Sequence, residues 1–255
     1  MMRVVNSFLD ACLKKITEAQ EKYNIQDFSC LDLEEEVDAT SIILGVSCEQ
    51  DDIKRVQHEV FYPLIKFYWD NLRNILDLLK INNTMEDLYH NVCERAFNFC
   101  LTYHRTNEFR ALRFLLYKHL VSLTNPSQDS SNQKFRLVWS AKTAELQMKT
   151  RIAQLDVACK LGLWIEAINI VTDIRSLSTK SSMLAEYYEK VSCVLWELKK
   201  YFYHAYALLR MLALQKRQNK ELSEEKLRAM ATQACLASLC VPIYSIVCEY
   251  EYEYE

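Results

Sequence analysis

Residues 137–177 read LVWSAKTAELQMKTRIAQLDVACKLGLWIEAINIVTDIRSL, and this stretch predicts two helices separated by a glycine. In the first, apolar or small residues recur at intervals of three and four, the spacing of one helix face: Met148, Ile152, Leu155, Ala158 and Cys159. Gly162 then interrupts the pattern, and glycine suits the left-handed conformation of a helix end. A second helix begins at Leu163, and we expect Trp164 to be buried where the two helices meet.

Small residues accompany this break. Ala158, Gly162 and Ala167 stand where two antiparallel helices must approach closely. A helical hairpin of this tetratricopeptide kind cannot bury its apolar face alone, so it stacks on further hairpins. The stretch therefore predicts an all-α, antiparallel helical-repeat solenoid.

Composition favours the same fold class. The chain has 255 residues but only two glycines and three prolines, so we expect long helices joined by short connections. Hydrophobic residues make up 50% and charged residues 25%, which is a globular balance. The formal net charge is −3, so no strong global charge argues for nucleic acid or an acidic membrane as the main partner, and local charged patches stay open.

The first helical-repeat segment is predicted over residues 1–124. It opens with a helix whose apolar face runs from Val4 to Ile16, and an acidic linker follows near residues 25–52. Helical periodicity resumes at Ile53, with a restart or kink near Tyr62 because Pro63 follows. Two further helices are expected before residue 124.

The second helical-repeat segment is predicted over residues 133–243, after a polar linker at 125–132. Ser223 is a candidate cap for its last helix. A membrane span over the uncharged run 230–248 is one interpretation, but its polar residues and Pro242 make it a poor span. Residues 244–255 form a low-complexity tail that ends in alternating Glu and Tyr.

The ten cysteines include no Cys-x-x-Cys pair. Most of them stand among apolar neighbours at helical spacing: Cys93, Cys100, Cys159, Cys193 and Cys235. We therefore expect reduced core thiols in a cytoplasmic protein rather than a disulfide framework. The first residues lack the features of a signal peptide.

Catalytic chemistry has little support. His90 with Cys93, and Cys100 with His104, share helix faces, but zinc would require both pairs to converge, and core packing is the simpler explanation. The pair Asp51–Asp52 resembles the metal-binding aspartates of all-α prenyl synthases, yet the further aspartate that those enzymes need is missing. There is no glycine-rich phosphate loop and no nucleophile elbow. We expect no cofactor, no metal and no enzymatic activity.

Basic and aromatic residues suggest one RNA-contact hypothesis. Aromatic clusters at 187–188 and 201–203 could stack on bases beside Lys199 and Lys200, although inter-helix packing also explains such rings. The residues we single out for contact with ribosomal RNA fall in a predicted helix-end loop: Lys216, Arg217 and Lys220.

A series of short collinear matches then covers nearly the whole chain. They include KFYW at 66–69, AFNFCL at 96–101, RIAQLD at 151–156, LWIEA at 163–167, YYEKVS at 187–192 and LASL at 236–239. In these segments the chain resembles the amino-terminal helical region of one family, the largest subunit of eukaryotic translation initiation factor 3. In that family further repeats precede this region, and a PCI module and a charged helical tail follow it, so we expect a fragment.

The resemblance implies a non-catalytic scaffold in the cytoplasm. Its implied partners are subunits B and C of initiation factor 3, the small ribosomal subunit, and mRNA or ribosomal RNA; no membrane is implied. Two alternatives stay open at this point. One is a PCI-type scaffold of another complex, such as the proteasome lid or the signalosome. The other is an all-α enzyme, which the lack of acid pairs and metal sets argues against.

Overall fold

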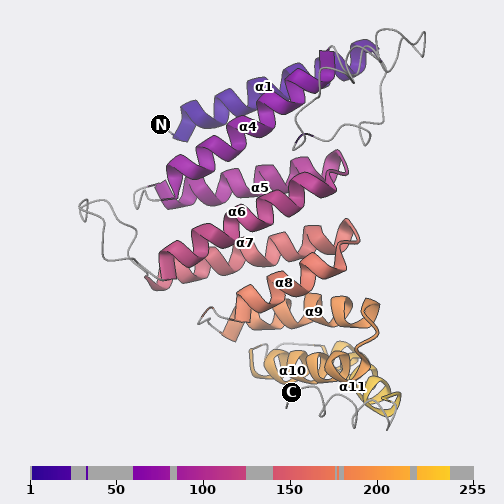
Figure 1. Ribbon diagram of the computed structural model, residues 1–255. Helices are drawn as coiled ribbons and strands as arrows, with labels where there is room; N and C mark the ends of the chain where they lie inside the picture. Colours follow the sequence, from indigo (N-terminus) through magenta and orange to yellow (C-terminus); the bar gives the residue numbers. More distant parts are fainter. Residues whose placement is uncertain are drawn as a thin grey trace, which may run out of the picture. The chain divides into compact units, whose positions relative to one another are not determined.

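The regular structure is entirely helical in the part of the chain that the computed structural model describes, which is residues 2–23, 33, 60–80, 85–124, 140–175, 177, 181–218 and 223–241. The helices, as Figure 1 labels them, are α1 (Met2–Tyr23), α4 (Tyr62–Leu79), α5 (Glu86–Thr102), α6 (Thr106–Thr124), α7 (Ala141–Lys160), α8 (Trp164–Arg175), α9 (Ser181–Glu197), α10 (Tyr201–Gln218) and α11 (Glu224–Leu239). The predicted all-α helical-repeat fold is confirmed.

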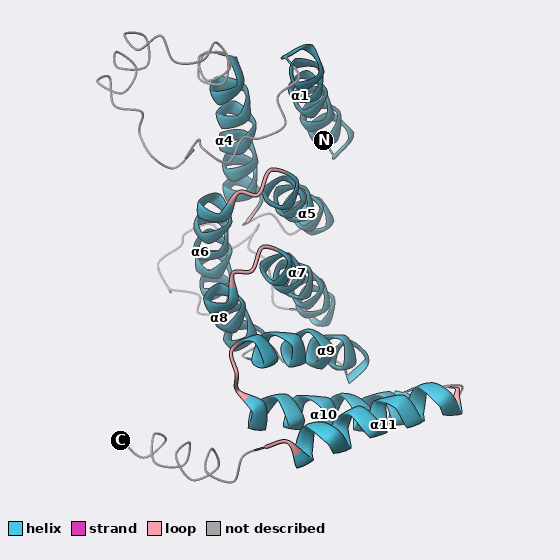
Figure 2. Cartoon of the chain, turned by 90° about the vertical axis from the view of Figure 1, so that its right-hand side faces the viewer, coloured by secondary structure: helices cyan, strands magenta, loops and turns pink. Residues whose placement is uncertain are grey.

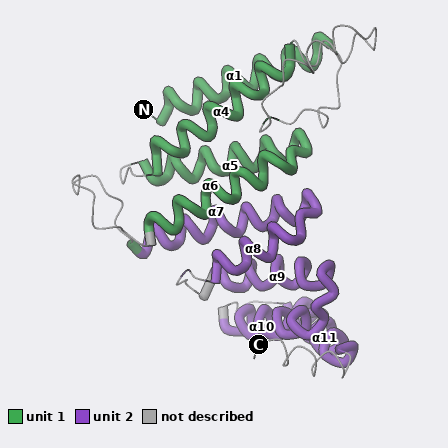
Figure 3. The backbone as a smooth tube through the Cα atoms, in the orientation of Figure 1, with its two compact units in different colours: residues 1–140 green, residues 141–255 purple. Residues whose placement is uncertain are grey.

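The chain divides into two compact units, residues 1–140 and 141–255 (Figure 3). Of the segments predicted as linkers or tail, residues 125–132 and 244–255 lie outside the described residues, and so does 25–52 except for Leu33. The expected boundaries at residues 124 and 133 therefore stay a prediction.

In the first unit, successive helices pack as antiparallel neighbours. Helix α4 packs against α1 and α5, and α5 also packs against α6. Pro63 stands in the first turn of α4, where a proline costs no helical hydrogen bond. The helix begins at Tyr62, where the sequence predicts a restart or kink, and residues 51–59 before it lie outside the described residues. An ion pair of 2.5 Å joins Arg95 on α5 to Asp10 on α1.

A buried polar contact ties Leu33 to α6. The Leu33 side chain is buried, and its backbone N–H donates to Glu108 Oε1 at 3.2 Å. The same oxygen lies 3.5 Å from Arg105 Nη1, and both of these charged side chains are only 2% exposed. One residue of the predicted acidic linker therefore docks onto the helices.

In the second unit, the α7–α8 hairpin turns at Gly162 as predicted. Gly162 has a φ of +70°, in the left-handed region. Its N–H donates to the Cys159 carbonyl at 3.1 Å, and the N–H of Leu163 donates to the Ala158 carbonyl at 2.9 Å. These bonds satisfy carbonyls that the end of α7 would otherwise leave unpaired.

Replacing Gly162 by alanine should destabilise the chain by roughly 1–2 kcal/mol, the usual cost of a left-handed conformation for a residue with a Cβ. No heavy atom lies within 4 Å of the added Cβ, so the cost comes from the backbone alone. Denaturant unfolding of the full chain measures it. Gly162→Asn is the matched control and should lose less, because asparagine tolerates this conformation; equal losses would contradict the argument.

Helix α9 is the centre of the second unit. It packs against α7, α8 and α10, and α10 runs beside α11 (Figure 2). Asp156 on α7 forms ion pairs with Lys190 on α9 and, at 2.7 Å, with Lys160. Burial raises the pKa of Asp156, but hydrogen bonds from the two lysines outweigh this effect, and the net pKa lies below its usual value.

Two expectations about burial in this unit are wrong. Trp164 is half-buried rather than buried, because it lies in the first turn of α8 beside the exposed Ile165. Cys193 and Cys235 are exposed, whereas Cys93 and Cys100 are buried as expected. Ser223 does precede α11, but its side chain makes no capping hydrogen bond.

An aromatic groove as the candidate binding site

A groove with a volume of about 940 Å³ lies among α8, α9 and α10. Its lining residues recur at intervals of three and four on each helix, so each helix contributes one face. The α9 stripe runs through Leu184, Tyr187, Tyr188, Val191 and Leu195. The volume falls near the upper end of the range of ligand sites, which makes this groove the candidate functional site.

Tyr187 lies on the floor of the groove and links two of its helices. This side chain is buried, and its hydroxyl donates to the Val171 carbonyl oxygen at 3.4 Å, which joins α9 to α8. Burial raises the pKa of Tyr187 to about 12, so the phenol keeps its proton at neutral pH. The ring of Tyr188 packs edge-on against it, with 5.2 Å between centroids.

The rim of the groove is basic. Arg175, at the end of α8, and Lys200, just before α10, are both exposed and line the groove. No aspartate or glutamate is found among its described lining residues. Two tyrosines of α10, Tyr203 and Tyr206, are also exposed here, so apolar and cationic surface lie side by side.

Two of the three residues predicted to contact RNA lie in the described part of the chain. Lys216 and Arg217 are exposed in the last turn of α10, and Lys220 lies outside the described residues. Thirteen residues separate Tyr203 from Lys216, which corresponds to roughly 20 Å along a helix. The candidate cations therefore lie well away from the groove aromatics on the same helix.

The predicted aromatic clusters separate as well. Tyr187, Tyr188, Phe202 and Tyr203 line the groove. Tyr201 instead packs edge-on against Trp196, with 5.6 Å between centroids. The contribution of α8, including Val171 and Arg175, could not be predicted from the sequence, because no local pattern shows which face of α8 lines the groove.

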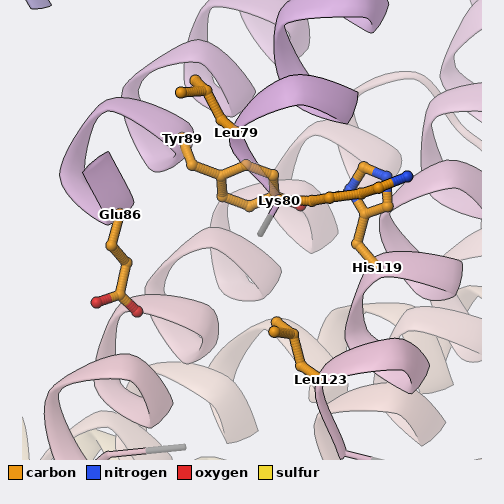
Figure 4. Close-up of a pocket in the computed structure, with 6 residues that line it drawn as sticks. All are labelled: Leu79, Lys80, Glu86, Tyr89, His119 and Leu123. Atoms are coloured by element: carbon orange, nitrogen blue, oxygen red, sulfur yellow. The ribbon is translucent and has the colours of Figure 1, made fainter. Parts of the chain in front are cut away.

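A second, much smaller hollow lies in the first unit between the end of α4, α5 and α6 (Figure 4). Its volume is about 10 Å³, room for about one water molecule. Beside it, the ring nitrogens of His119 lie 3.1 Å from the Tyr89 hydroxyl and 3.1 Å from Asp77 Oδ1. This polar relay joins three helices and has no room for a substrate.

The residues considered for metal chemistry do not converge. Among the described residues, no group of three or more His, Cys, Asp and Glu side chains is placed to hold a metal ion. His90 and Cys93 are buried, whereas His104 is exposed in the turn after α5. Burial raises the pKa of Cys100 well above its usual value, so this thiol stays protonated. Asp51 and Asp52 lie outside the described residues.

Membrane insertion was a further interpretation of the sequence. The described helices include none with the length and apolar character needed to span a bilayer. Helix α11 ends at Leu239, and residues 242–248 of the uncharged run lie outside the described part.

Comparison with known proteins gives the family. The family profile described as "eIF3a, PCI domain, TPR-like region" matches residues 1–254. The chain is 31% identical over 254 residues to the eukaryotic translation initiation factor 3 protein eIF3a of Aedes aegypti, a match covering 97% of this chain and 22% of the relative. It is 32% identical over 246 residues to the Homo sapiens protein of that name, covering 94% and 18%. It is 37% identical over 220 residues to the Nicotiana tabacum protein, covering 84% and 22%.

The chain thus spans about a fifth of the length of the curated relatives that it matches, between 18% and 22% in these three. The profile, by contrast, extends over nearly every residue, through both units and all the helices of the groove. The resemblance inferred from short segments therefore holds across the whole sequence, and the chain belongs to the eIF3a family of eukaryotic translation initiation factor 3.

Proposed function

We propose that this chain is a non-catalytic scaffold of the initiation factor 3 complex in the cytoplasm, helping the complex to bind mRNA and the small ribosomal subunit. Its partners in this role are subunits B and C. The observation that carries the proposal is the match of the family profile over residues 1–254. Helical hairpins suit such a role because rigid repeats present extended surfaces to other proteins.

The residues of the described part support binding rather than catalysis. The large groove has an apolar floor and a basic rim, and its charged lining residues are Arg175 and Lys200. Histidine, aspartate, glutamate and cysteine are common general acids and bases, and none of them is found among the described lining residues of the groove. An array of helices with such a groove fits a protein that holds other chains.

We also propose that the chain contacts RNA, at residues outside the groove. Lys216 and Arg217 are exposed at the end of α10, and Lys220 follows them in the sequence. Such lysines and arginines would meet phosphates and give binding that weakens as salt rises. Helix α10 would then carry a protein-binding face near its start and a phosphate-binding end.

Copurification tests the scaffold proposal. The tagged full chain, expressed in eukaryotic cells, is expected to bring down subunits B and C together with small-subunit ribosomal proteins. Recovery of proteasome-lid or signalosome subunits instead would contradict it and favour the other PCI-type scaffold. A parallel preparation carrying Lys216→Glu and Arg217→Glu should retain the protein subunits but lose part of the salt-sensitive RNA.

A further inference from the structure

We propose that the groove among α8, α9 and α10 binds an acidic, amphipathic helical segment of a partner protein. This inference rests on the proposed scaffold function and gives that function a surface and a kind of partner. Binding of this type places an amphipathic helix in an apolar groove, with anchors at positions i, i+3, i+4 and i+7.

At the groove, helix α9 is flanked by two helices, α8 and α10. Helix α10 packs along α9, and α8 packs against another part of it, but α8 and α10 are not closely packed against each other. The α9 stripe, which includes Val191, forms the floor of the groove between them, and Tyr188 of this stripe also packs against the core formed by Leu208, Met211 and Ala234. With side walls from α8 and α10, this floor has the shape of a trough between helices.

Most of the described side chains that line the groove are aliphatic or aromatic. Aliphatic residues of α8 and α9, such as Ile168, Val171 and Leu195, give the floor its apolar character. Tyr203 and Tyr206 of α10 are exposed beside it, and tyrosine is enriched among residues that dominate binding energy at protein interfaces. A partner with leucine, phenylalanine or similar anchors would bury its side chains here.

The charged side chains among the described lining residues are positive and would attract an acidic partner. Arg175 and Lys200 line the groove, and Lys199 is exposed next to Lys200 in the sequence. Arg210 of α10 lies over the ring of Tyr188, 6.0 Å from its centroid. The glutamates of α9, at positions 186, 189 and 197, are exposed but are not among the lining residues. A segment with acidic flanks would find opposite charges on the rim, and a basic segment would be repelled.

The same observations favour protein over RNA as the occupant. Proteins that bind single strands combine a basic track along the backbone with exposed stacking rings. Here Tyr203 and Tyr206 are exposed, but Tyr187 is buried with its hydroxyl bonded to Val171, and only two cations are found among the described lining residues. The more strongly basic end of α10, at Lys216 and Arg217, lies elsewhere on the helix.

Fluorescence anisotropy with three labelled probes tests the proposal on the full chain. The first probe is an 18-residue helical peptide with leucine and phenylalanine on one face and glutamates on the flanks. The second has lysine in place of each glutamate, and the third is a single-stranded oligouridylate. We expect the acidic peptide to bind about tenfold more tightly than the lysine peptide, because rim charges discriminate between partners.

Substitutions of the lining residues test whether the peptides bind in the groove. Arg175→Glu and Lys200→Glu should each weaken the acidic peptide by about tenfold and reduce its preference over the lysine peptide. Tyr203→Ala should weaken both peptides by about tenfold, as truncation of an interfacial anchor does. Tyr201→Ala is the matched control, because Tyr201 lies on the same helix and is 37% exposed, as Tyr203 is, but faces Trp196. Lys226→Glu is the charge control on α11.

Three results would overturn the inference. The first is no measurable binding of the acidic peptide, and the second is an equal effect of the groove variants and the control variants. The third is that the oligouridylate binds more tightly than the acidic peptide and that Tyr203→Ala weakens this oligouridylate binding. Because the substituted side chains are exposed, circular dichroism should show that every variant is folded. Copurification of initiation factor subunits is measured separately, so failure of the scaffold proposal and failure of this one remain distinguishable.

Discussion

Trp69→Ala is expected to lower the free energy of unfolding by about 3–5 kcal/mol, the usual cost of removing a large buried aromatic side chain. Trp69 lies on α4 with 0% of its side chain exposed. Its ring stacks on Phe99 of α5, with 5.7 Å between centroids and 20° between the ring planes. Truncation removes this contact and leaves a cavity in the core of the first unit. Guanidinium unfolding of the full chain, followed by circular dichroism, measures the loss.

Leu78→Ala is the control for this measurement. Leu78 lies on the same helix and is 78% exposed, so its replacement should change stability by less than about 0.5 kcal/mol. Because the chain has two compact units, the loss in Trp69→Ala should appear in the transition that involves the first unit. Equal stability of the two variants would show that the α4–α5 contact contributes little to the native state.

The contrast between Trp69 and Trp164 shows what helical periodicity can predict. The sequence suggested a buried Trp164 because apolar residues surround it, but successive residues on a helix point in directions about 100° apart. On a helix that buries only one face, a run such as Leu163–Ile165 is therefore not buried throughout. In α8 the buried apolar residues are Ala167, Ile170 and Ile174, at intervals of three and four, and Ile165 on another face is 73% exposed.

Helix order and helix ends were more predictable than the binding surface. Gly162, Pro63 and Ser223 mark helix boundaries through local backbone chemistry, and the helices begin or end beside them. The groove depends on the spacing of α8 and α10 around α9, which no local pattern encodes. For the same reason the sequence grouped Tyr201 with Tyr203, although the two side chains have different neighbours.

Buried charges were likewise invisible in the sequence. Arg105 and Glu108 are three residues apart, which is the pattern of an exposed ion pair on a helix surface. Their burial comes from tertiary contacts, including the hydrogen bond from Leu33, which lies far away in the sequence. Arg105 also caps the end of α5, since its N–H donates to the Cys100 carbonyl at 2.8 Å.

Arg105→Met is therefore expected to cost about 3–5 kcal/mol, because it removes a buried cation from beside the buried Glu108 carboxylate. The hydrogen bond from the Leu33 N–H would remain, but a neutral donor does not replace the charge of a guanidinium. The double variant Arg105→Met, Glu108→Gln removes both charges and keeps an acceptor for Leu33. It should recover a large part of the loss, since a buried pair replaced by neutral groups is often close to neutral in stability. Guanidinium unfolding of the two variants decides the matter: if the double variant were as unstable as the single one, the cost would come from lost packing around Arg105 and not from an uncompensated charge on Glu108.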